Sequence, residues 1–172
     1  TDYVFDGTQQ TPYRETDSVN PIGVYGKSKL MGEELALLHA PDSLIVRTSW
    51  VYSRHGSNFV KTMLRLMQEK EGIGVVADQF GCPTYAIDLA SALLTMLQSA
   101  IIPAGVYHFS NSGTISWYQF ALAIANLTGS KCLVKPLTTA AYPTLAKRPE
   151  WSVLSNEKIA TTFGITQYNW EQ

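Results

Sequence analysis

The sequence has few charged residues and no excess of either sign. Asp, Glu, Lys and Arg make up 16% of the 172 residues, well below the roughly one quarter of a typical soluble domain, and the net charge is −1. This balance lacks the basic surface of nucleic-acid-binding proteins and offers no polybasic membrane anchor. No apolar run approaches the roughly 18 residues of a membrane span. We therefore expect no nucleic acid and no membrane among the partners, and a cytoplasmic location.

Cysteine is scarce as well. Cys82 and Cys132 are the two cysteines, and they lie too far apart in the sequence for a zinc-ligand pattern or a disulfide framework. The three histidines also lack ligand spacing, so no metal site is predicted. Hydrophobic residues make up 45% of the chain, which is enough for a core, and the length suits one domain or two small ones.

A starting methionine and a signal-peptide pattern are missing too. The chain opens instead with Thr1–Phe5, an apolar segment typical of the end of a strand. We therefore expect the chain to be the back part of a longer protein.

Strand-like and helix-like segments alternate along the sequence, which predicts an α/β fold. Strands are expected at residues 1–5, 43–52, 74–77, 106–109 and 132–137, and helices at 23–39, 58–69, 85–98, 116–127 and 155–163. In the helix at 23–39 the apolar positions Val24, Met31, Leu35 and Leu38 share one face.

Three details of these elements carry separate expectations. Ser116 and Gln119 form a capping box that begins a helix. Trp117, in the first turn of that helix, is interpreted as a core residue. Arg47 ends a buried strand, so a buried carboxylate partner is expected for its charge.

Tyr25 and Lys29 lie four residues apart on a predicted helix, and therefore on one face. An ammonium beside a phenol favours the phenolate, so such a pair can protonate a carbonyl oxygen while a hydride reaches the carbonyl carbon. The spacing alone is weak, because a surface lysine beside a half-buried tyrosine gives the same pattern. The context adds weight: the helix lies between two strands, so its first turn faces the sheet edge where α/β proteins bind ligands.

Four sequence blocks carry a resemblance to a known family. They are Thr-Asp-Tyr-Val-Phe-Asp-Gly at 1–7, Val-Tyr-Gly-Lys-Ser-Lys-Leu at 24–30, Arg-Thr-Ser-Trp-Val-Tyr at 47–52 and Asp-Gln-Phe-Gly-Cys-Pro-Thr at 78–84. Together the blocks resemble the dTDP-4-dehydrorhamnose reductase family, which belongs to the extended short-chain dehydrogenase/reductase superfamily. Arg148-Pro149, Ser152-Val153-Leu154 and Trp170 also resemble the C-terminal part of that family.

The resemblance implies the back part of a Rossmann-like parallel sheet plus a smaller α/β substrate-binding subdomain. Residues 1–52 would be the catalytic remainder of the Rossmann-like domain. Residues 53–172 would be mostly substrate-binding subdomain, with segments around 85–110 returning to the Rossmann-like sheet.

The resemblance also implies roles for individual residues. Thr1, Tyr25 and Lys29 match the family's catalytic residues: Tyr25 would be the general acid, Lys29 would bind the nicotinamide ribose, and Thr1 would orient the sugar ketone. Asp2, Tyr3 and Trp50 match positions that contact the sugar. Ser49 and Val51 would join Tyr25 and Lys29 in binding the cofactor.

The implied reaction is the reduction, by NADPH or NADH, of the C4 ketone of dTDP-4-dehydro-6-deoxy-L-mannose to dTDP-L-rhamnose. The partner would be this dTDP-linked 4-keto-6-deoxysugar, and a homodimer with a second copy of the chain stays open. The Gly-rich turn that binds the cofactor's pyrophosphate is absent, since no helix directly follows Gly72-Ile73-Gly74. The chain alone is therefore expected to be inactive.

Two other functions stay open at this point. One is a non-catalytic relative that acts as a regulatory or binding subunit, such as the regulatory subunit of methionine adenosyltransferase. The other is a different extended-family enzyme, a nucleotide-sugar epimerase or dehydratase. The presence of Thr1, Tyr25, Lys29 and Trp50 together favours the reductase, because a regulator need not keep all four.

Overall fold

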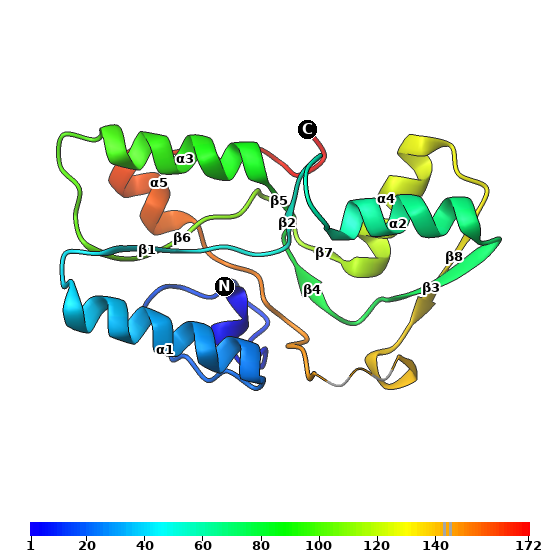
Figure 1. Cartoon of the computed structure of the whole chain (residues 1–172), viewed down its shortest axis with the longest axis horizontal. Coiled ribbons are helices and arrows are strands. Elements are labelled where there is room, and N and C mark those ends of the chain that lie inside the picture. The colour runs from blue at the N-terminus through cyan, green and yellow to red at the C-terminus, as the bar shows by residue number, and fades with distance from the viewer. Residues whose placement is uncertain (143, 145) are drawn as a thin grey trace.

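The computed structural model describes residues 1–142, 144 and 146–172. The helices are α1 (Val24–His39), α2 (Phe59–Glu69), α3 (Ala86–Gln98), α4 (Trp117–Thr128) and α5 (Glu157–Phe163), with 3-10 turns η1 at Asp2–Val4 and η2 at Thr139–Ala141. The strands are β1 (Leu44–Arg47), β2 (Val51–Tyr52), β3 (Gly72–Val76), β4 (Phe80–Gly81), β5 (Thr84–Tyr85), β6 (Gly105–His108), β7 (Ile115–Ser116) and β8 (Leu133–Leu137). The predicted α/β class is confirmed, and the elements form two groups joined by short strands (Figure 1).

The first group is built on two parallel strands. β1 pairs with β6 in a register that runs from Leu44 opposite Gly105 to Arg47 opposite His108. α1 lies on one side of this pair and α3 with α5 on the other (Figure 1). Parallel strands covered on both faces are typical of doubly wound α/β proteins. Within the described residues, no strand pairs with the second edge of β1.

The second group is built on the parallel pair β3 and β8, which α2 and α4 cover (Figure 1). Its core contains Met63 and Met67 from α2, and Phe120 and Ile124 from α4. Asn58 caps α2 by accepting a hydrogen bond from the backbone N–H of Lys61. This polar cap fixes where α2 begins, and the apolar positions that follow decide which face of the helix is buried.

The predicted capping box is confirmed at the start of α4. The Ser116 side chain accepts from the backbone N–H of Gln119, and the Gln119 side chain accepts from that of Ser116. Gly129 and Gly164 end α4 and α5 in the left-handed conformation, with φ of 62° and 66°, which a glycine adopts without steric cost.

Two expectations about the elements are wrong. Thr1–Phe5 is not a strand end, because the Thr1 side chain caps a 3-10 turn by accepting from the Tyr3 N–H. The expected strand at 43–52 is two strands, because Trp50 interrupts it with a φ of 47°.

The apolar face of α1 lies at the surface. Val24, Met31, Leu35 and Leu38 are 84%, 53%, 49% and 71% exposed, and Gly26 is the buried residue of this helix. The apolar spacing predicted the helix correctly, but the spacing alone does not say what covers this face.

The short strands β4, β5 and β7 were not expected, since two residues are too few to show a period. β2 pairs with β5 in parallel and β4 with β7 in antiparallel, and both pairs lie between the two groups (Figure 1).

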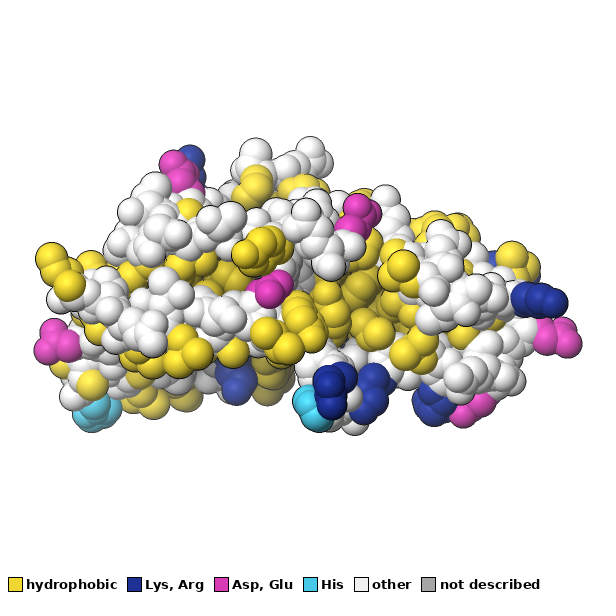
Figure 2. All heavy atoms as spheres, turned by 90° about the horizontal axis from the view of Figure 1, so that it is seen from above, with side chains coloured by type: hydrophobic (Ala, Val, Ile, Leu, Met, Phe, Trp, Pro, Cys, Tyr) yellow, Lys and Arg dark blue, Asp and Glu magenta, His cyan; other side chains and the backbone are white. Residues whose placement is uncertain are grey.

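None of the described helices is both long and apolar enough to cross a membrane. Hydrophobic side chains are spread over the face seen from above (Figure 2), and Ile87, Leu94 and Leu97 of α3 are each more than half exposed.

Candidate active site

Seven of the eight residues predicted for the site line one open hollow of about 470 Å³. The lining residues are Thr1, Asp2, Tyr3, Tyr25, Lys29, Thr48, Trp50, Val51 and Trp117. They come from η1, from the first two turns of α1, from the segment after β1 and from the first residue of α4. The structure therefore brings together residues that are far apart in the sequence.

Tyr25 and Lys29 lie one turn apart at the start of α1, as the sequence predicts. The Lys29 Nζ atom is 5.6 Å from the centre of the Tyr25 ring. Tyr3 meets the Tyr25 ring edge-on, with 6.1 Å between ring centres. Tyr25 is 55% exposed, so its hydroxyl can reach a bound ligand. A phenol with a cation at its side is an arrangement that can donate a proton.

A close backbone contact holds the start of α1 against η1. Gly26 is buried, and a Cβ atom at this position would collide with the carbonyl oxygen of Tyr3 and lie 2.9 Å from the Cβ of Pro21. Only a glycine allows the helix to approach this closely. Because Gly26 follows Tyr25 directly, the same contact sets the position of the phenol.

The Thr1 hydroxyl lies in a short hydrogen-bond chain at the floor of the hollow. It donates to Oδ1 of Asp2 at 3.1 Å and accepts from the Tyr3 N–H at 3.3 Å. Burial raises the pKa of Asp2 to about 6. Asp2 Oδ2 and the Thr48 hydroxyl are buried without a hydrogen-bond partner among the described residues. Unpaired polar atoms at the edge of a hollow are suited to binding the hydroxyl groups of a ligand.

Trp50 enters the hollow from the segment between β1 and β2. Its ring stacks on the ring of Trp117, with 3.4 Å between the centres and 9° between the planes. Val51 follows it and is 43% exposed. An aromatic face of this kind gives a sugar ring a large apolar contact area.

Ser49 is the one predicted site residue that does not line the hollow. It is 1% exposed, and its hydroxyl donates to the carbonyl oxygen of Cys82 at 2.7 Å. In this position Ser49 joins the end of β1 to the loop before β5. Its assignment to the cofactor site stays a prediction.

Trp117 and Thr48 line the hollow, and sequence reasoning missed both. Trp117 was expected in the core, and it does pack there against Phe59 at 4.6 Å between ring centres. However, it is also part of the wall of the hollow. The capping box could have shown that Trp117 lies at the tip of a helix, where a large ring reaches beyond the core.

A second hollow, of about 410 Å³, is also lined by Trp117. It is mainly apolar, with Phe59, Met63 and Leu66 of α2 on one side, and it also includes Gln79 and Arg148. Trp117 is common to both hollows. A ligand with an apolar planar group at one end and a sugar at the other could therefore occupy both.

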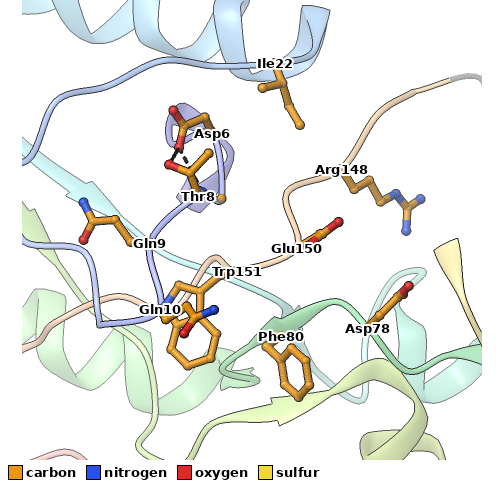
Figure 3. A pocket seen from close by; sticks show the side chains of 11 residues that line it. Asp6, Thr8, Gln9, Gln10, Ile22, Asp78, Phe80, Arg148, Glu150 and Trp151 are labelled. Carbon is orange, nitrogen blue, oxygen red and sulfur yellow. Dashed lines mark hydrogen bonds between the residues drawn. The ribbon is translucent and has the colours of Figure 1, made fainter.

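A third hollow, of about 860 Å³, is wider and more polar (Figure 3). Asp6, Glu150 and Trp151 are among its lining residues, and Arg148 is common to it and the second hollow. The Asp6 carboxylate accepts hydrogen bonds from the Thr8 side chain and backbone, so it is already paired within its own loop. This hollow contains none of the residues predicted for catalysis.

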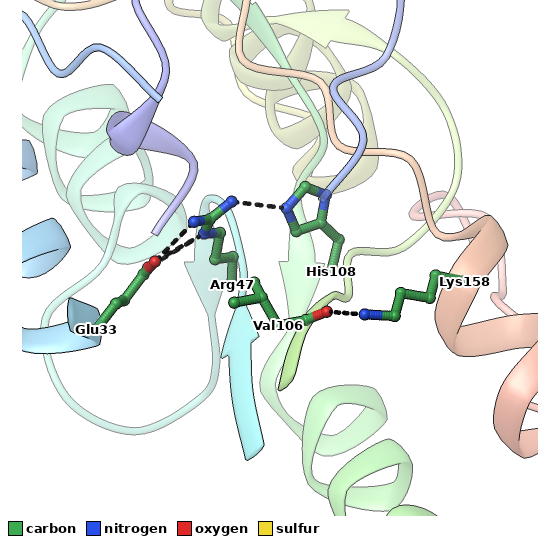
Figure 4. Close-up of polar contacts among 5 residues, drawn as sticks. All are labelled: Glu33, Arg47, Val106, His108 and Lys158. Atoms are coloured by element: carbon green, nitrogen blue, oxygen red, sulfur yellow. Dashed lines mark hydrogen bonds and ion pairs between the residues drawn. The ribbon is translucent and has the colours of Figure 1, made fainter. Parts of the chain in front are cut away.

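A buried charged network connects α1 to the sheet (Figure 4). Nε and Nη2 of Arg47 on β1 donate to the carboxylate of Glu33 on α1 at 3.0 and 2.7 Å. The side chains of Arg47 and Glu33 are only 5% and 10% exposed. The buried carboxylate partner expected for Arg47 is thus confirmed, and it belongs to the helix that carries Tyr25 and Lys29.

His108 on β6 completes this network in its neutral form. Its Nδ1 lies 3.1 Å from the Tyr13 carbonyl oxygen, and its Nε2 lies 3.5 Å from Nη1 of Arg47. Nδ1–H can donate to the carbonyl while Nε2 accepts from the guanidinium, so a second proton has no acceptor. Burial and then the Arg47 charge lower the pKa of His108 from 6.5 to about 3.

The low pKa of His108 predicts a loss of stability in acid. Between pH 6.5 and 3 the unfolded chain binds a proton at His108 and the folded chain does not, so the free energy of unfolding falls as pH falls. The slope is about 1.4 kcal/mol per pH unit over this window. Urea unfolding at several pH values measures the free energy of unfolding of the wild type and of His108→Gln. The difference between the two proteins should change with pH by this slope. An identical pH dependence in both proteins would contradict it.

The fold and the hollow together define the class of the protein. A parallel α/β arrangement with the Tyr25 and Lys29 pair beside a Thr at the sheet edge is that of an extended short-chain dehydrogenase/reductase. The RmlD substrate binding domain family matches residues 1–172, and the chain belongs to this family.

Curated relatives agree with this assignment. The chain is 47% identical over 182 residues to dTDP-4-dehydrorhamnose reductase of Aggregatibacter actinomycetemcomitans, covering 100% of this chain and 62% of the relative. It is 48% identical over 172 residues to the spore coat polysaccharide biosynthesis protein SpsK of Bacillus subtilis, covering 100% of this chain and 59% of the relative. The chain thus spans about three fifths of the length of these relatives.

Solved structures show the same fold. A dTDP-4-dehydrorhamnose reductase from Clostridium acetobutylicum matches with a TM-score of 0.94 and 43% identity, covering 99% of this chain and 60% of that one. The reductase of Bacillus anthracis, solved in complex with NADP, matches with a TM-score of 0.93 and 40% identity, with the same coverage. A UDP-glucuronic acid 4-epimerase from Bacillus cereus has a TM-score of 0.84 at 17% identity, which shows a shared fold.

Proposed function

We propose that this chain provides the proton donor and the nucleotide-sugar site of a reductase. The enzyme would use NADPH or NADH to convert dTDP-4-dehydro-6-deoxy-L-mannose to dTDP-L-rhamnose. The observation that carries this proposal is that Thr1, Tyr25, Lys29 and Trp50 line one hollow. The reductases among the relatives support the choice of substrate.

Within this hollow each residue has a distinct task. The Tyr25 hydroxyl gives its proton to the ketone oxygen at C4, and the Lys29 ammonium stabilises the phenolate that results. The Thr1 hydroxyl holds the same oxygen in place, after its hydrogen bond to Asp2 is exchanged for one to the substrate. Trp50 packs against the sugar ring, and Asp2 and Tyr3 complete the wall around it.

The cofactor fits the described residues only at its nicotinamide end. Tyr25, Lys29 and Val51 form an open edge of the hollow that can receive the nicotinamide ribose. The cofactor supplies the hydride that is transferred to C4. No turn among the described residues has the strand, glycine-rich loop and helix that hold a pyrophosphate. The adenine half would therefore bind outside this chain.

The nucleotide of the substrate suits the second hollow. Its apolar wall of Phe59, Met63 and Leu66 can pack against a base, and the Arg148 guanidinium can pair with a diphosphate. Because Trp117 adjoins both hollows, the base and the sugar of one molecule would lie on either side of it. Residues 1–52 then provide catalysis and residues 53–172 most of the nucleotide site, with β6 from the segment around 85–110 paired to β1.

Trp50→Ala is expected to raise the KM for the nucleotide sugar more than the KM for NADPH, because the apolar face over the sugar is lost. Steady-state kinetics with each substrate varied in turn measures both constants. Trp50→Phe, which keeps a flat ring, is the matched variant and should restore most of the affinity. Equal losses for sugar and cofactor would mean that Trp50 supports the fold instead.

The direct test of the proposed function is an assay of the protein that carries this chain. With the keto-sugar and NADPH it should oxidise NADPH and form dTDP-L-rhamnose in equal amounts, as measured by absorbance and by chromatography of the product. Binding of the keto-sugar without any turnover would instead support a regulatory subunit. Interconversion of sugar epimers without net NADPH oxidation would support an epimerase.

A further inference from the structure

Trp50 has a backbone conformation that its own side chain disfavours. Its φ is 47°, and it is the only non-glycine with a positive φ in the described part of the chain. Residues with a bulky side chain rarely adopt this left-handed region, and when they do the surrounding structure must hold them there. The contacts of the Trp50 indole supply this restraint.

Two such contacts hold the indole. One is the stack on Trp117, with 3.4 Å between ring centres. The other is Gly81 on β4, where a Cβ atom would lie only 2.6 Å from Cε2 of the Trp50 ring. The absence of a side chain at Gly81 therefore makes the space that the indole fills.

The position of Trp117 is itself fixed, by the start of its own helix and by a neighbouring ring. It is the first residue of α4, which the capping box of Ser116 and Gln119 holds in place, and its ring packs against Phe59 of α2. Its outer surface lines the catalytic hollow together with Trp50. The second group of elements thus presents a rigid aromatic surface to a strained residue of the first group.

We infer that Trp117 is a positioning residue that holds the Trp50 indole over the sugar, with Gly81 providing the room. This inference rests on the proposed function, because it assumes that Trp50 contacts the sugar of the substrate. Without a flat ring at position 117 the Trp50 backbone relaxes from its left-handed conformation. The indole then leaves the hollow, and the sugar loses its apolar contact.

A role in the core alone would place fewer requirements on the shape of the side chain at position 117. The packing against Phe59 needs only an apolar side chain of similar volume. Holding the Trp50 ring parallel needs a second flat ring, so the two roles are separated by comparing Leu with Phe at this position. Gly81 gives an independent approach, because Gly81→Ala displaces the Trp50 ring and leaves Trp117 unchanged.

The test measures kinetics and circular dichroism on the protein that carries this chain. Trp117→Leu and Gly81→Ala should each raise the KM for the keto-sugar roughly three- to tenfold, the range expected for loss of an aromatic contact, with the KM for NADPH unchanged. Trp117→Phe should restore a KM close to that of the wild type. In a Trp50→Ala background, Trp117→Leu should add no further effect.

Circular dichroism gives a readout that packing alone would not change. Two indoles stacked at this distance couple electronically and give a paired positive and negative band in the far ultraviolet. Trp50→Phe and Trp117→Phe should each abolish the paired band, and Gly81→Ala should weaken it. Trp170→Phe, which removes an indole outside both hollows, should leave the band unchanged, and thermal melting confirms that each variant is folded.

The outcomes separate this inference from the proposed function. If the wild type does not reduce the keto-sugar, the proposed function fails. If the wild type is active and Trp50→Ala raises the sugar KM, but Trp117→Leu and Gly81→Ala do not, the inference alone is overturned. The inference is also overturned if Trp117→Phe is as impaired as Trp117→Leu, because a flat ring would then not be the feature that matters.

Discussion

Tyr25→Phe is expected to lower the turnover number for reduction of the keto-sugar by roughly 10²–10⁴-fold, with little change in the KM for the sugar. The substitution removes the hydroxyl that protonates the ketone oxygen and keeps the ring that packs edge-on against Tyr3. Ground-state binding therefore survives and the transition state loses its acid. Steady-state kinetics of the variant protein measures both quantities.

Tyr168→Phe is the matched control for this experiment. Tyr168 is 58% exposed and lines none of the three hollows described above, so loss of its hydroxyl should leave turnover unchanged. Turnover of Tyr25→Phe close to that of the wild type would show that another group provides the proton.

The second large effect is on stability. Arg47→Met should lower the free energy of unfolding by about 3–5 kcal/mol, because it leaves the Glu33 carboxylate buried without its partner. Replacement of both residues, as in Glu33→Leu with Arg47→Met, should recover most of this loss, because no isolated charge then remains in the interior. Urea unfolding of the two variants and the wild type measures the differences.

The exposed ion pair of Arg65 and Glu69 on α2 is the control for the buried pair. Its side chains are 61% and 51% exposed, and its atoms are 2.9 Å apart. Solvent screens such a pair, so Arg65→Met should cost no more than about 0.5 kcal/mol. Equal costs for Arg47→Met and Arg65→Met would show that burial does not give the Glu33–Arg47 pair its importance.

The buried pair also affects catalysis through α1. Leu30 of this helix packs against the cluster of Val4, Phe5 and Tyr13, and Gly26 and the Glu33–Arg47 pair are two further attachments of the helix to the rest of the described chain. Tyr25 directly precedes Gly26, and Lys29 lies between Gly26 and Glu33. Loss of either attachment lets the helix shift, and a shift of the proton donor by about 1 Å is enough to lower the turnover number.

Local signals in the sequence were sufficient to find most of the helices. The capping box at Ser116, the helix-ending Gly164 and the spacing of Tyr25 and Lys29 act within a few residues, so each can be seen without the fold. The charge on Arg47 likewise required a buried carboxylate, although its identity as Glu33 depends on how α1 lies on the sheet.

Other features depend on residues far apart in the sequence. The interruption at Trp50 comes from Gly81 and Trp117, which are distant from it along the chain, so no local pattern predicts it. The exposure of Leu38 depends on what lies beside α1 and not on the spacing of its apolar residues. The place of Ser49 in the cofactor site is implied by the family resemblance and stays a prediction, and its hydrogen bond to the carbonyl oxygen of Cys82 could not be predicted from the local sequence.

The central proposal is that this chain holds the nucleotide sugar and the proton donor, and that the pyrophosphate-binding turn for the cofactor lies outside it. Calorimetric titration of the 172-residue chain tests this most directly, first with dTDP-L-rhamnose and then with NADPH. We expect saturable binding of the nucleotide sugar, weakened by Trp50→Ala, and no binding of NADPH at micromolar concentrations. Micromolar binding of NADPH, or no binding of the nucleotide sugar by the folded chain, would contradict the proposal.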